Sequence, residues 1–461
     1  MKGLFCRVAA GLTLAAAAAS PAAATEGYFQ AGYGTLQKAV AGAGVANPGD
    51  AMALSINPAG LVDLPQMITG GVSAFMPFRG YTASGPGFAA PGALSGTVNS
   101  GSNFFVMPNI AYSSPIDATT AWGIAMYGNG GMNTSYPSVL NPNGQCPGIG
   151  VGVFCGGPTG VDLKQMFISV GIAKRFGNVS IGIAPIFAMQ MFRAEGLGIF
   201  AFPPFPFPPG MAATFSANPW GMSNNGVSTS VGGGARLGVE WKALPTLRIG
   251  IAGQTPMAMT AFAAYSGLFA DGGRFDIPGN ITAGLAYDAL PTLTLMGEYK
   301  HIFYSGVAAI SNPGYTLIVP FVQPPGLGMK MGGAGGPGFG WHDVDVWTVA
   351  AEWRVTPDLS LRAGYAHNTN PVRWTDVTFN ILAPGIVTDH ITGGFGYKIS
   401  PNSSIDFAGT FVPTHNVTGP EMTPYGFNTM RSITLSMHQF EASLGYSYKF
   451  GAAPMAVVAK Y

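Results

Sequence analysis

The chain has 461 residues, of which only 9% are charged and 48% are hydrophobic, and its 21 Lys and Arg almost balance its 20 Asp and Glu. Soluble domains carry about 25% charged residues, so an ordinary soluble domain is excluded, and the lack of a basic patch excludes nucleic acid as a partner. Beyond residue 24 there is no run of 18 apolar residues that would form a membrane-spanning helix, so a closed β-barrel is the remaining spanning structure that satisfies its own backbone.

Residues 1–24 have the pattern of a secretory signal peptide. Two basic residues precede an apolar stretch (8–19), and small residues then lead to an A-x-A type site, with cleavage expected after Ala24. The alternative, a membrane helix, would require about 20 apolar residues. The pattern therefore predicts an exported protein.

The stretch 25–65 shows no strand alternation and is dominated by Gly, Ala and small polar residues. Barrels larger than the smallest are commonly closed by part of their own chain. We therefore expect residues 25–65 to form an N-terminal plug inside the lumen. A disordered tail is the alternative.

Fourteen segments alternate apolar with small or polar side chains over about ten residues each, as spanning strands do. They are 66–78, 104–116, 120–130, 162–176, 178–192, 227–241, 246–259, 275–289, 292–304, 343–355, 359–368, 387–399, 403–413 and 435–450. The expected fold class is all-β, a transmembrane antiparallel β-barrel of about 14 strands over residues 66–450.

The connections between these segments alternate strictly in length. Six short turns lie at 117–119, 177, 242–245, 290–291, 356–359 and 400–402, and seven long loops lie at 79–103, 131–161, 193–226, 260–274, 305–342, 369–386 and 414–434. In outer-membrane barrels the short turns face the periplasm and the long loops face outward. Residues 451–461 either close the last strand or form a tail.

Two of the three cysteines, Cys146 and Cys155, lie in one glycine-rich long loop. Exported proteins meet an oxidising compartment, so we expect a disulfide between them. The alternative of a metal site is disfavoured because no histidine lies nearby. No metal and no cofactor are expected.

The same alternation separates the two faces of the barrel wall. Leu359 and Leu361 share the apolar, lipid-facing side, so Arg362 points inward, and the same argument places Lys300 inside. Such charges are expected to pair across the lumen. Alternatively, one or two cations bind an anionic ligand, and Lys300 and Arg362 are then the candidates because both lie near mid-height.

The run GTLQKAVAGAGVANPGDAMALSINPAGLVDL, which contains Asn57-Pro58-Ala59, resembles the N-terminal region of the outer-membrane long-chain fatty acid transporter family, the FadL/TodX group. The ending MHQFEASLGYSYKF is similar to the last strands of that family. The resemblance implies a monomeric barrel in the outer membrane of a Gram-negative cell, plugged from its N-terminus, that passes hydrophobic molecules. In that family the ligand is caught by an apolar groove among the outer loops, moves to an inner pocket and leaves sideways where the third strand is kinked.

Carried over to this sequence, the resemblance assigns the plug motif to Asn57, Pro58 and Ala59. The third strand carries four glycines that permit a kink for lateral opening, because glycine tolerates backbone geometry that other residues cannot adopt. These are Gly123, Gly128, Gly130 and Gly131. Ordinary strand curvature is the alternative reading of these glycines.

The third long loop contains IFAFPPFPFPPGM (199–211), which is apolar yet too rich in proline to be a strand. It falls at one of the positions where the resembling family forms its first hydrophobic site, and the prolines would reduce the entropy lost on binding. The expected capture residues are Phe200, Phe202, Phe205, Phe207, Met211, Phe215 and Trp220. The alternative is that these side chains pack on the barrel rim.

None of the six histidines lies in a G-x-S-x-G or H-E-x-x-H context, so we expect no enzyme. The expected function is passive uptake of long-chain fatty acids or other hydrophobic compounds. Its partners would be that ligand and outer-membrane lipid. A general porin, or a structural or adhesive barrel, is the alternative.

Overall fold

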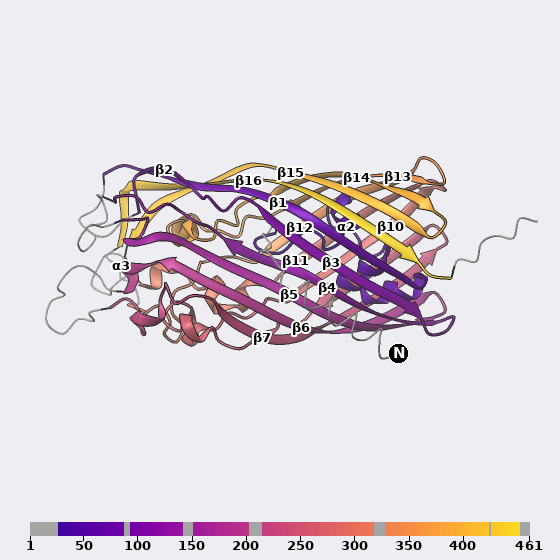
Figure 1. Ribbon diagram of the computed structural model, residues 1–461, viewed down its shortest axis with the longest axis horizontal. Coiled ribbons are helices and arrows are strands. Elements are labelled where there is room, and N and C mark those ends of the chain that lie inside the picture. Colours follow the sequence, from indigo (N-terminus) through magenta and orange to yellow (C-terminus); the bar gives the residue numbers. More distant parts are fainter. Residues whose placement is uncertain are drawn as a thin grey trace, which may run out of the picture.

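The computed structural model describes residues 26–86, 93–141, 151–201, 214–317, 328–423 and 426–451. These residues form one antiparallel sheet of 16 strands, of which two, β2 and β9, are short additions, leaving fourteen in the barrel wall. The last strand, β16, pairs with the first, β1, so the sheet is closed (Figure 1). The expected all-β, fourteen-stranded barrel is confirmed. The signal peptide lies outside the described residues.

The wall strands follow the chain in order, each paired with its neighbours. They are β1 Met67–Ser84, β3 Phe105–Pro115, β4 Thr120–Asn133, β5 Gly156–Phe176, β6 Val179–Gly196, β7 Ser228–Leu244, β8 Leu247–Gln254, β10 Asn280–Leu290, β11 Leu293–Ile302, β12 Val344–Arg354, β13 Leu359–Asn368, β14 Asp389–Ser400, β15 Ser403–Thr423 and β16 Gly426–Lys449. The additions are β2 Gly96–Asn99, paired with β1, and β9 Ala258–Met259, paired with β7.

Short turns gather at one end of the barrel and long connections at the other, at the right and left of Figure 1. One expected long loop, 414–434, is largely strand instead, because β15 and β16 continue as a paired hairpin to Thr423 and Gly426. The inward side chains of this hairpin, such as Ile433 and Leu435, are fully buried, and β15 contacts another long loop at residues 374–376. This burial favours the extended hairpin over an open loop.

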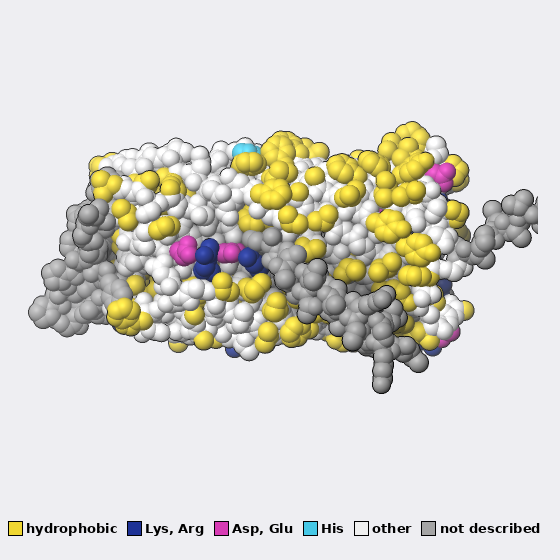
Figure 2. Space-filling view, in the orientation of Figure 1, with side chains coloured by type: hydrophobic (Ala, Val, Ile, Leu, Met, Phe, Trp, Pro, Cys, Tyr) yellow, Lys and Arg dark blue, Asp and Glu magenta, His cyan; other side chains and the backbone are white. Residues whose placement is uncertain are grey.

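The outward side chains of the wall are mostly apolar and exposed, as the alternation predicts. Examples from different strands are Val170, Ile251 and Val349. In Figure 2 apolar side chains are spread widely over the half of the barrel that carries the short turns, and charged groups are few. A surface with many apolar and few charged side chains suits a bilayer better than water.

The N-terminal segment, residues 26–66, contains three short helices: α2 Thr35–Ala39, η1 Ala51–Ser55 and η2 Pro58–Asp63. Each 3₁₀-helix has its own cap, because the side chains of Asp50 and Asn57 accept hydrogen bonds from the backbone N–H groups of Met52 (2.8 Å) and Ala59 (3.0 Å). Pro58 follows its cap at the first helical position, where a missing N–H costs nothing.

This segment contacts the wall from several sides. Lys38 of α2 forms an ion pair with Glu441 of β16 and donates to Ser73 Oγ of β1 at 3.0 Å. On β11, the carboxylate of Glu298 accepts the backbone N–H groups of Gly44 at 2.9 Å and Val45 at 3.0 Å. The segment is therefore bound to strands from different parts of the wall by both charge and backbone contacts.

The Asn57-Pro58-Ala59 motif lies against β6 and β7. Asn57 Nδ2 donates to the carbonyl of Val45 (2.7 Å) within the segment and to that of Val239 (3.2 Å) in the wall. A side chain at Gly182 or Gly238 would collide with the motif, so the wall provides glycine where the motif lies against it. The motif is thus a docking point on the wall.

The long connections contain the remaining short helices. They are α3 Gly198–Ala201, η3 Pro219–Gly221, η4 Ala263–Tyr265, α4 Ala270–Gly273, η5 Tyr304–Gly306, α5 Ala308–Ser311, η6 Gly314–Leu317, η7 Trp374–Asp376 and η8 Phe379–Ile381. Among the described residues no helix has the length and apolar character to cross a membrane.

Candidate functional site

An aromatic cluster is buried beneath the long loops. Tyr304 lies 5.4 Å from Tyr28 and 5.3 Å from Trp341, measured between ring centroids, and Phe269 lies 4.7 Å from Phe192. All five rings are buried. Because Tyr28 comes from the N-terminal segment and the others from the wall and loops, the cluster joins three parts of the chain around an apolar interior.

The expected capture residues separate into three groups. Phe200 is buried and packs edge-on against Phe154 (5.3 Å) and Phe379 (5.5 Å), and Phe215 is buried as well. Trp220, in contrast, is 79% exposed. The remaining four, Phe202, Phe205, Phe207 and Met211, lie outside the described residues. Capture of ligand by this loop stays a prediction.

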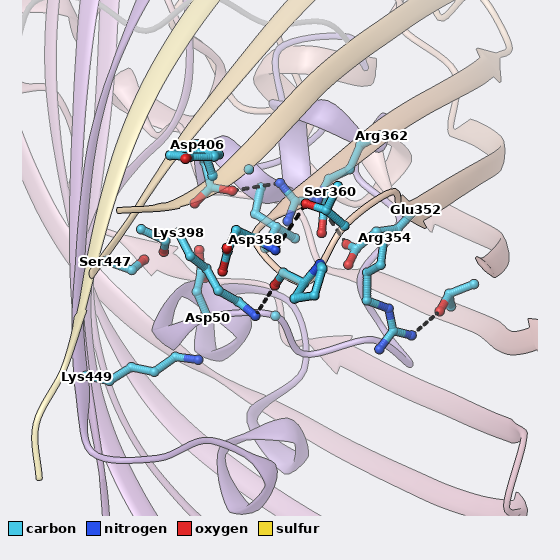
Figure 3. Close-up of a pocket in the computed structure, with 18 of the residues that line it drawn as sticks. Asp50, Glu352, Arg354, Asp358, Ser360, Arg362, Lys398, Asp406, Ser447 and Lys449 are labelled. Carbon is cyan, nitrogen blue, oxygen red and sulfur yellow. Dashed lines mark hydrogen bonds and ion pairs between the residues drawn. The ribbon is translucent and has the colours of Figure 1, made fainter. Parts of the chain in front are cut away.

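Both expected lumen cations carry carboxylate partners. Lys300 Nζ lies 2.9 Å from Glu26, which is buried in the N-terminal segment. Arg362 lies between Glu352, at 2.9 Å, and Asp406, at 2.7 Å (Figure 3). Their charges are therefore already compensated within the chain, and their role in binding an anionic ligand stays a prediction.

A cavity of about 740 Å³ opens at the end of the short turns, between the N-terminal segment and the wall from β8 to β16 (Figure 3). Charged and polar side chains make up most of its lining. Figure 3 shows several charged side chains converging on it from the N-terminal segment and from different strands; they are Asp50, Glu352, Arg354, Arg362, Lys398 and Asp406. We call this cavity the polar vestibule. A surface so rich in charge favours water and disfavours apolar molecules.

The wall is interrupted between β3 and β4. Their pairing runs from Pro115 opposite Ala121 to Asn109 opposite Tyr127 and stops there, although β3 continues to Phe105 along β1. Beyond Tyr127, β4 remains paired with β5. The part of β4 beyond Tyr127 is therefore not paired with β3, and the two strands are separated toward the end of the barrel that carries the long loops.

The four glycines of β4 take different places around this separation. The register of β4 against β5 shifts between Gly128 and Gly130, which marks a bulge at the start of the separated part, and Gly131 follows it. Gly123 lies lower, within the fully paired region, where it faces Leu61 of η2. Three of the four glycines thus accompany the bend, and their role in lateral opening stays a prediction.

The N-terminal segment replaces β3 as the partner of the separated part of β4. Gly131 N–H donates to Tyr28 O at 3.2 Å, Gln30 N–H donates to Asn129 O at 3.2 Å, and Phe29 forms a β-bridge with Gly130. A Cβ at Gly130 would overlap the Tyr28 carbonyl. Glycine is needed here because two backbones approach closely.

A groove of about 270 Å³ lies beside the separation, and we call it the outer groove. Ser102 and Phe105 line one side and Asn133 lines the other. Two ion pairs also line it, Asp162–Lys164 at 3.3 Å and Arg193–Glu195 at 3.1 Å.

Arg79 is a buried residue that the sequence interpretation did not identify. That interpretation ended the first strand at residue 78, whereas β1 continues to Ser84 and turns Arg79 inward, where it is buried. The same period-two parity, carried one residue further, would have placed Arg79 in the lumen.

Cys155 takes part in a disulfide. Cys146 lies outside the described residues, so the expected pairing stays a prediction. The described residues contain no cluster of His, Cys, Asp and Glu arranged to hold a metal ion.

No protein-family model and no curated protein sequence matches the chain. Solved structures do match. The toluene transporter TodX of P. putida is 17% identical, over 92% of this chain and 100% of that chain, with a TM-score of 0.62. A FadL homologue of Pseudomonas aeruginosa is 15% identical, over 92% and 100%, with a TM-score of 0.63.

The toluene transporter TbuX of Ralstonia pickettii is 17% identical, over 92% of this chain and 99% of that chain, with a TM-score of 0.56. Identities this low establish shared architecture and leave the cargo open. The chain has the fold of the FadL and TodX transporters, the group that its N-terminal motif resembles.

Proposed function

We propose that this protein is a non-enzymatic transporter of the outer membrane that takes up hydrophobic small molecules, long-chain fatty acids among them. Its apolar outer surface supports residence in a bilayer. Structures of the same fold include transporters of toluene and a FadL homologue. In this proposal residues 25–65 act as the plug, and one chain forms one transporter.

The interruption between β3 and β4 is the observation that carries the proposal. A molecule that crosses the barrel along its axis would have to pass the N-terminal segment and then the polar vestibule, where an apolar chain loses its favourable surroundings. The separation of β3 from β4 offers a path through the side of the wall instead. The cargo would then pass from the apolar interior through the wall beside the outer groove and would not cross the polar vestibule.

The entry side would be the long-loop end. The aromatic cluster gives the interior an apolar lining, and exposed Trp220 lies in the loop to which we assign capture. Apolar cargo binds such surfaces because each Å² of apolar area that is removed from water makes the binding free energy more favourable by about 25 cal/mol. The contacts of Phe200 with Phe154 and Phe379 would hold the base of this loop.

A porin is the competing function, and conductance separates the two. We expect cells or vesicles that carry the protein to take up oleate or toluene faster than those that lack it, with low ion conductance of the purified protein in planar bilayers. A large, open conductance without faster uptake would favour the porin. Replacing residues 199–220 by a Gly/Ser linker of equal length should slow uptake, and unchanged uptake would refute the capture role.

A further inference from the structure

Two buried arginines of the described residues, Arg79 and Arg236, have no carboxylate partner, and only Arg79 also lines a cavity beside the separation of β3 from β4. All 20 Asp and Glu residues lie within the described residues, because the stretches outside them contain none. Inward cations such as Lys38, Lys300 and Arg362 each have a carboxylate among these 20 as partner. Arg79, although only 5% exposed, has no side-chain carboxylate partner among the described residues.

The protein contacts of Arg79 leave much of its guanidinium unused. Nη2 donates to the carbonyl of Ser102, and Cζ lies 5.7 Å from the centre of the Phe105 ring. Nε is buried and has no hydrogen-bond partner in the described structure. Burying a charge costs free energy unless the charge is paired. The contacts of Arg79 with one carbonyl and one aromatic ring offset only part of that cost.

The position of Arg79 connects the interior with the outer groove. Arg79 itself lines a small inner cavity of about 20 Å³, together with Gly27, Trp341 and Met437. Its two neighbours, Ser102 and Phe105, line the outer groove instead. Asn133 lines both spaces. The guanidinium therefore lies on the inner side of the wall, between the inner cavity and the outer groove, near the separation of β3 from β4.

In this arrangement the inner cavity has room for about one water molecule. An anionic head group could therefore enter only if the Arg79 side chain gave up its hydrogen bond to Ser102 and turned toward the head group. The guanidinium suits this exchange, because its planar fork of N–H donors matches a carboxylate or phosphate in two parallel hydrogen bonds. A neutral hydrocarbon offers no such compensation.

We propose that Arg79 binds the anionic head group of an amphiphilic ligand at the separation of β3 from β4 and thereby favours anionic over neutral hydrophobic ligands. The effect of Arg79 on transport rests on the proposed function. Binding of the head group does not depend on the proposed function, because a head group can bind at Arg79 whether or not the ligand then crosses the wall.

The test compares oleate with methyl oleate, which has the same chain but no charge. For the purified full-length protein in detergent, we expect Arg79→Met to weaken oleate binding at least tenfold and to change methyl oleate binding less than twofold. Arg79→Lys should recover part of the loss, because Lys keeps the charge but lacks the fork. Equal losses for both ligands, or unchanged oleate binding, would overturn the proposal.

Arg236 offers a matched control. It is also buried and inward, and it donates to Tyr127 Oη at 3.3 Å and to Gln254, with no carboxylate partner in the described structure. It lines neither the inner cavity nor the outer groove. Arg236→Met should leave the ratio of oleate affinity to methyl oleate affinity within twofold of the wild-type ratio. A tenfold drop in that ratio would show that the effect is not specific to Arg79 and would contradict the proposal.

Uptake by vesicles separates this proposal from the proposed function. Wild-type protein that binds oleate in an Arg79-dependent way but takes up neither ligand would contradict transport and support the head-group site. Wild-type protein that takes up both ligands, with oleate binding unaffected in Arg79→Met, would support transport and overturn the site.

Discussion

Replacing Gly130 by Ala tests the contact between the N-terminal segment and the separated part of β4. The new Cβ would overlap the carbonyl oxygen of Tyr28 and would lie 2.9 Å from its carbonyl carbon and 3.3 Å from Phe29 Cα. All three atoms are backbone, so no side chain can move aside. The substitution must therefore push residues 28–30 away from β4.

The expected cost follows from the hydrogen bonds that this displacement breaks. Gly131 N–H loses Tyr28 O, and Gln30 N–H loses Asn129 O, both at 3.2 Å. At about 0.5–1.5 kcal/mol each, their loss lowers the local free energy of opening by about 1–3 kcal/mol. At about 1.4 kcal/mol per factor of ten, amide exchange at these sites should accelerate about 5- to 150-fold.

Hydrogen exchange read by mass spectrometry measures this effect. Gly297→Ala is the matched control, because Gly297 also lies within a wall strand, β11, and a Cβ there meets no atom within 4 Å. Gly130→Ala should accelerate exchange in residues 28–31 and 129–131 and leave β11 unchanged, whereas Gly297→Ala should leave residues 28–31 protected. Unchanged protection of residues 28–31 in Gly130→Ala would refute the reasoning.

Three further predictions concern buried charges. Lys38→Met leaves the carboxylate of Glu441 buried without its cation, so the N-terminal segment should lose about 3–5 kcal/mol of stability. Adding Glu441→Gln should restore most of that stability. The rate of proteolysis of the segment measures both the loss and the recovery. Arg431 and Glu421 form a fully buried pair at 3.1 Å in the β15–β16 hairpin. Arg431→Met alone should cost about 3–5 kcal/mol, and a loss under about 1 kcal/mol in thermal unfolding would contradict this. Asp50 belongs to the N-terminal segment and not to a spanning strand, and burial, reinforced by the nearby charge of another carboxylate, raises its pKa to about 7 from an ordinary 3.8. Because the folded segment then holds the proton more tightly than the unfolded one, its stability should be greatest below about pH 4 and fall as pH rises through 7. Asp50→Asn should remove that pH dependence from exchange rates in η1, and an unaltered pH profile would contradict the assignment.

The sequence by itself determined the number of wall strands and the faces of most of them. Period-two alternation is a local property, so the inward direction of Arg362 followed from its neighbours Leu359 and Leu361. The caps of the N-terminal segment are local as well, since Asn57 and Pro58 act on the helix that they start. These features depend on residues that are close together along the chain.

The tertiary structure decided the partners. Lys300 pairs with Glu26, which is 274 residues away, and no pattern along the strand identifies that carboxylate. The sequence interpretation likewise treated residue 79 as the start of a loop, because the paired extension of β1 depends on β16 beside it.

The separation of β3 from β4 was also outside the reach of the sequence alone. Glycines in β4 permit a bend, but the bent strand also needs hydrogen-bond partners for its backbone. Residues 28–30 provide these partners in the part of β4 that is not paired with β3. A barrel wall must satisfy its hydrogen bonds somewhere, and which chain segment satisfies them depends on the folded arrangement in space and not on the order of residues.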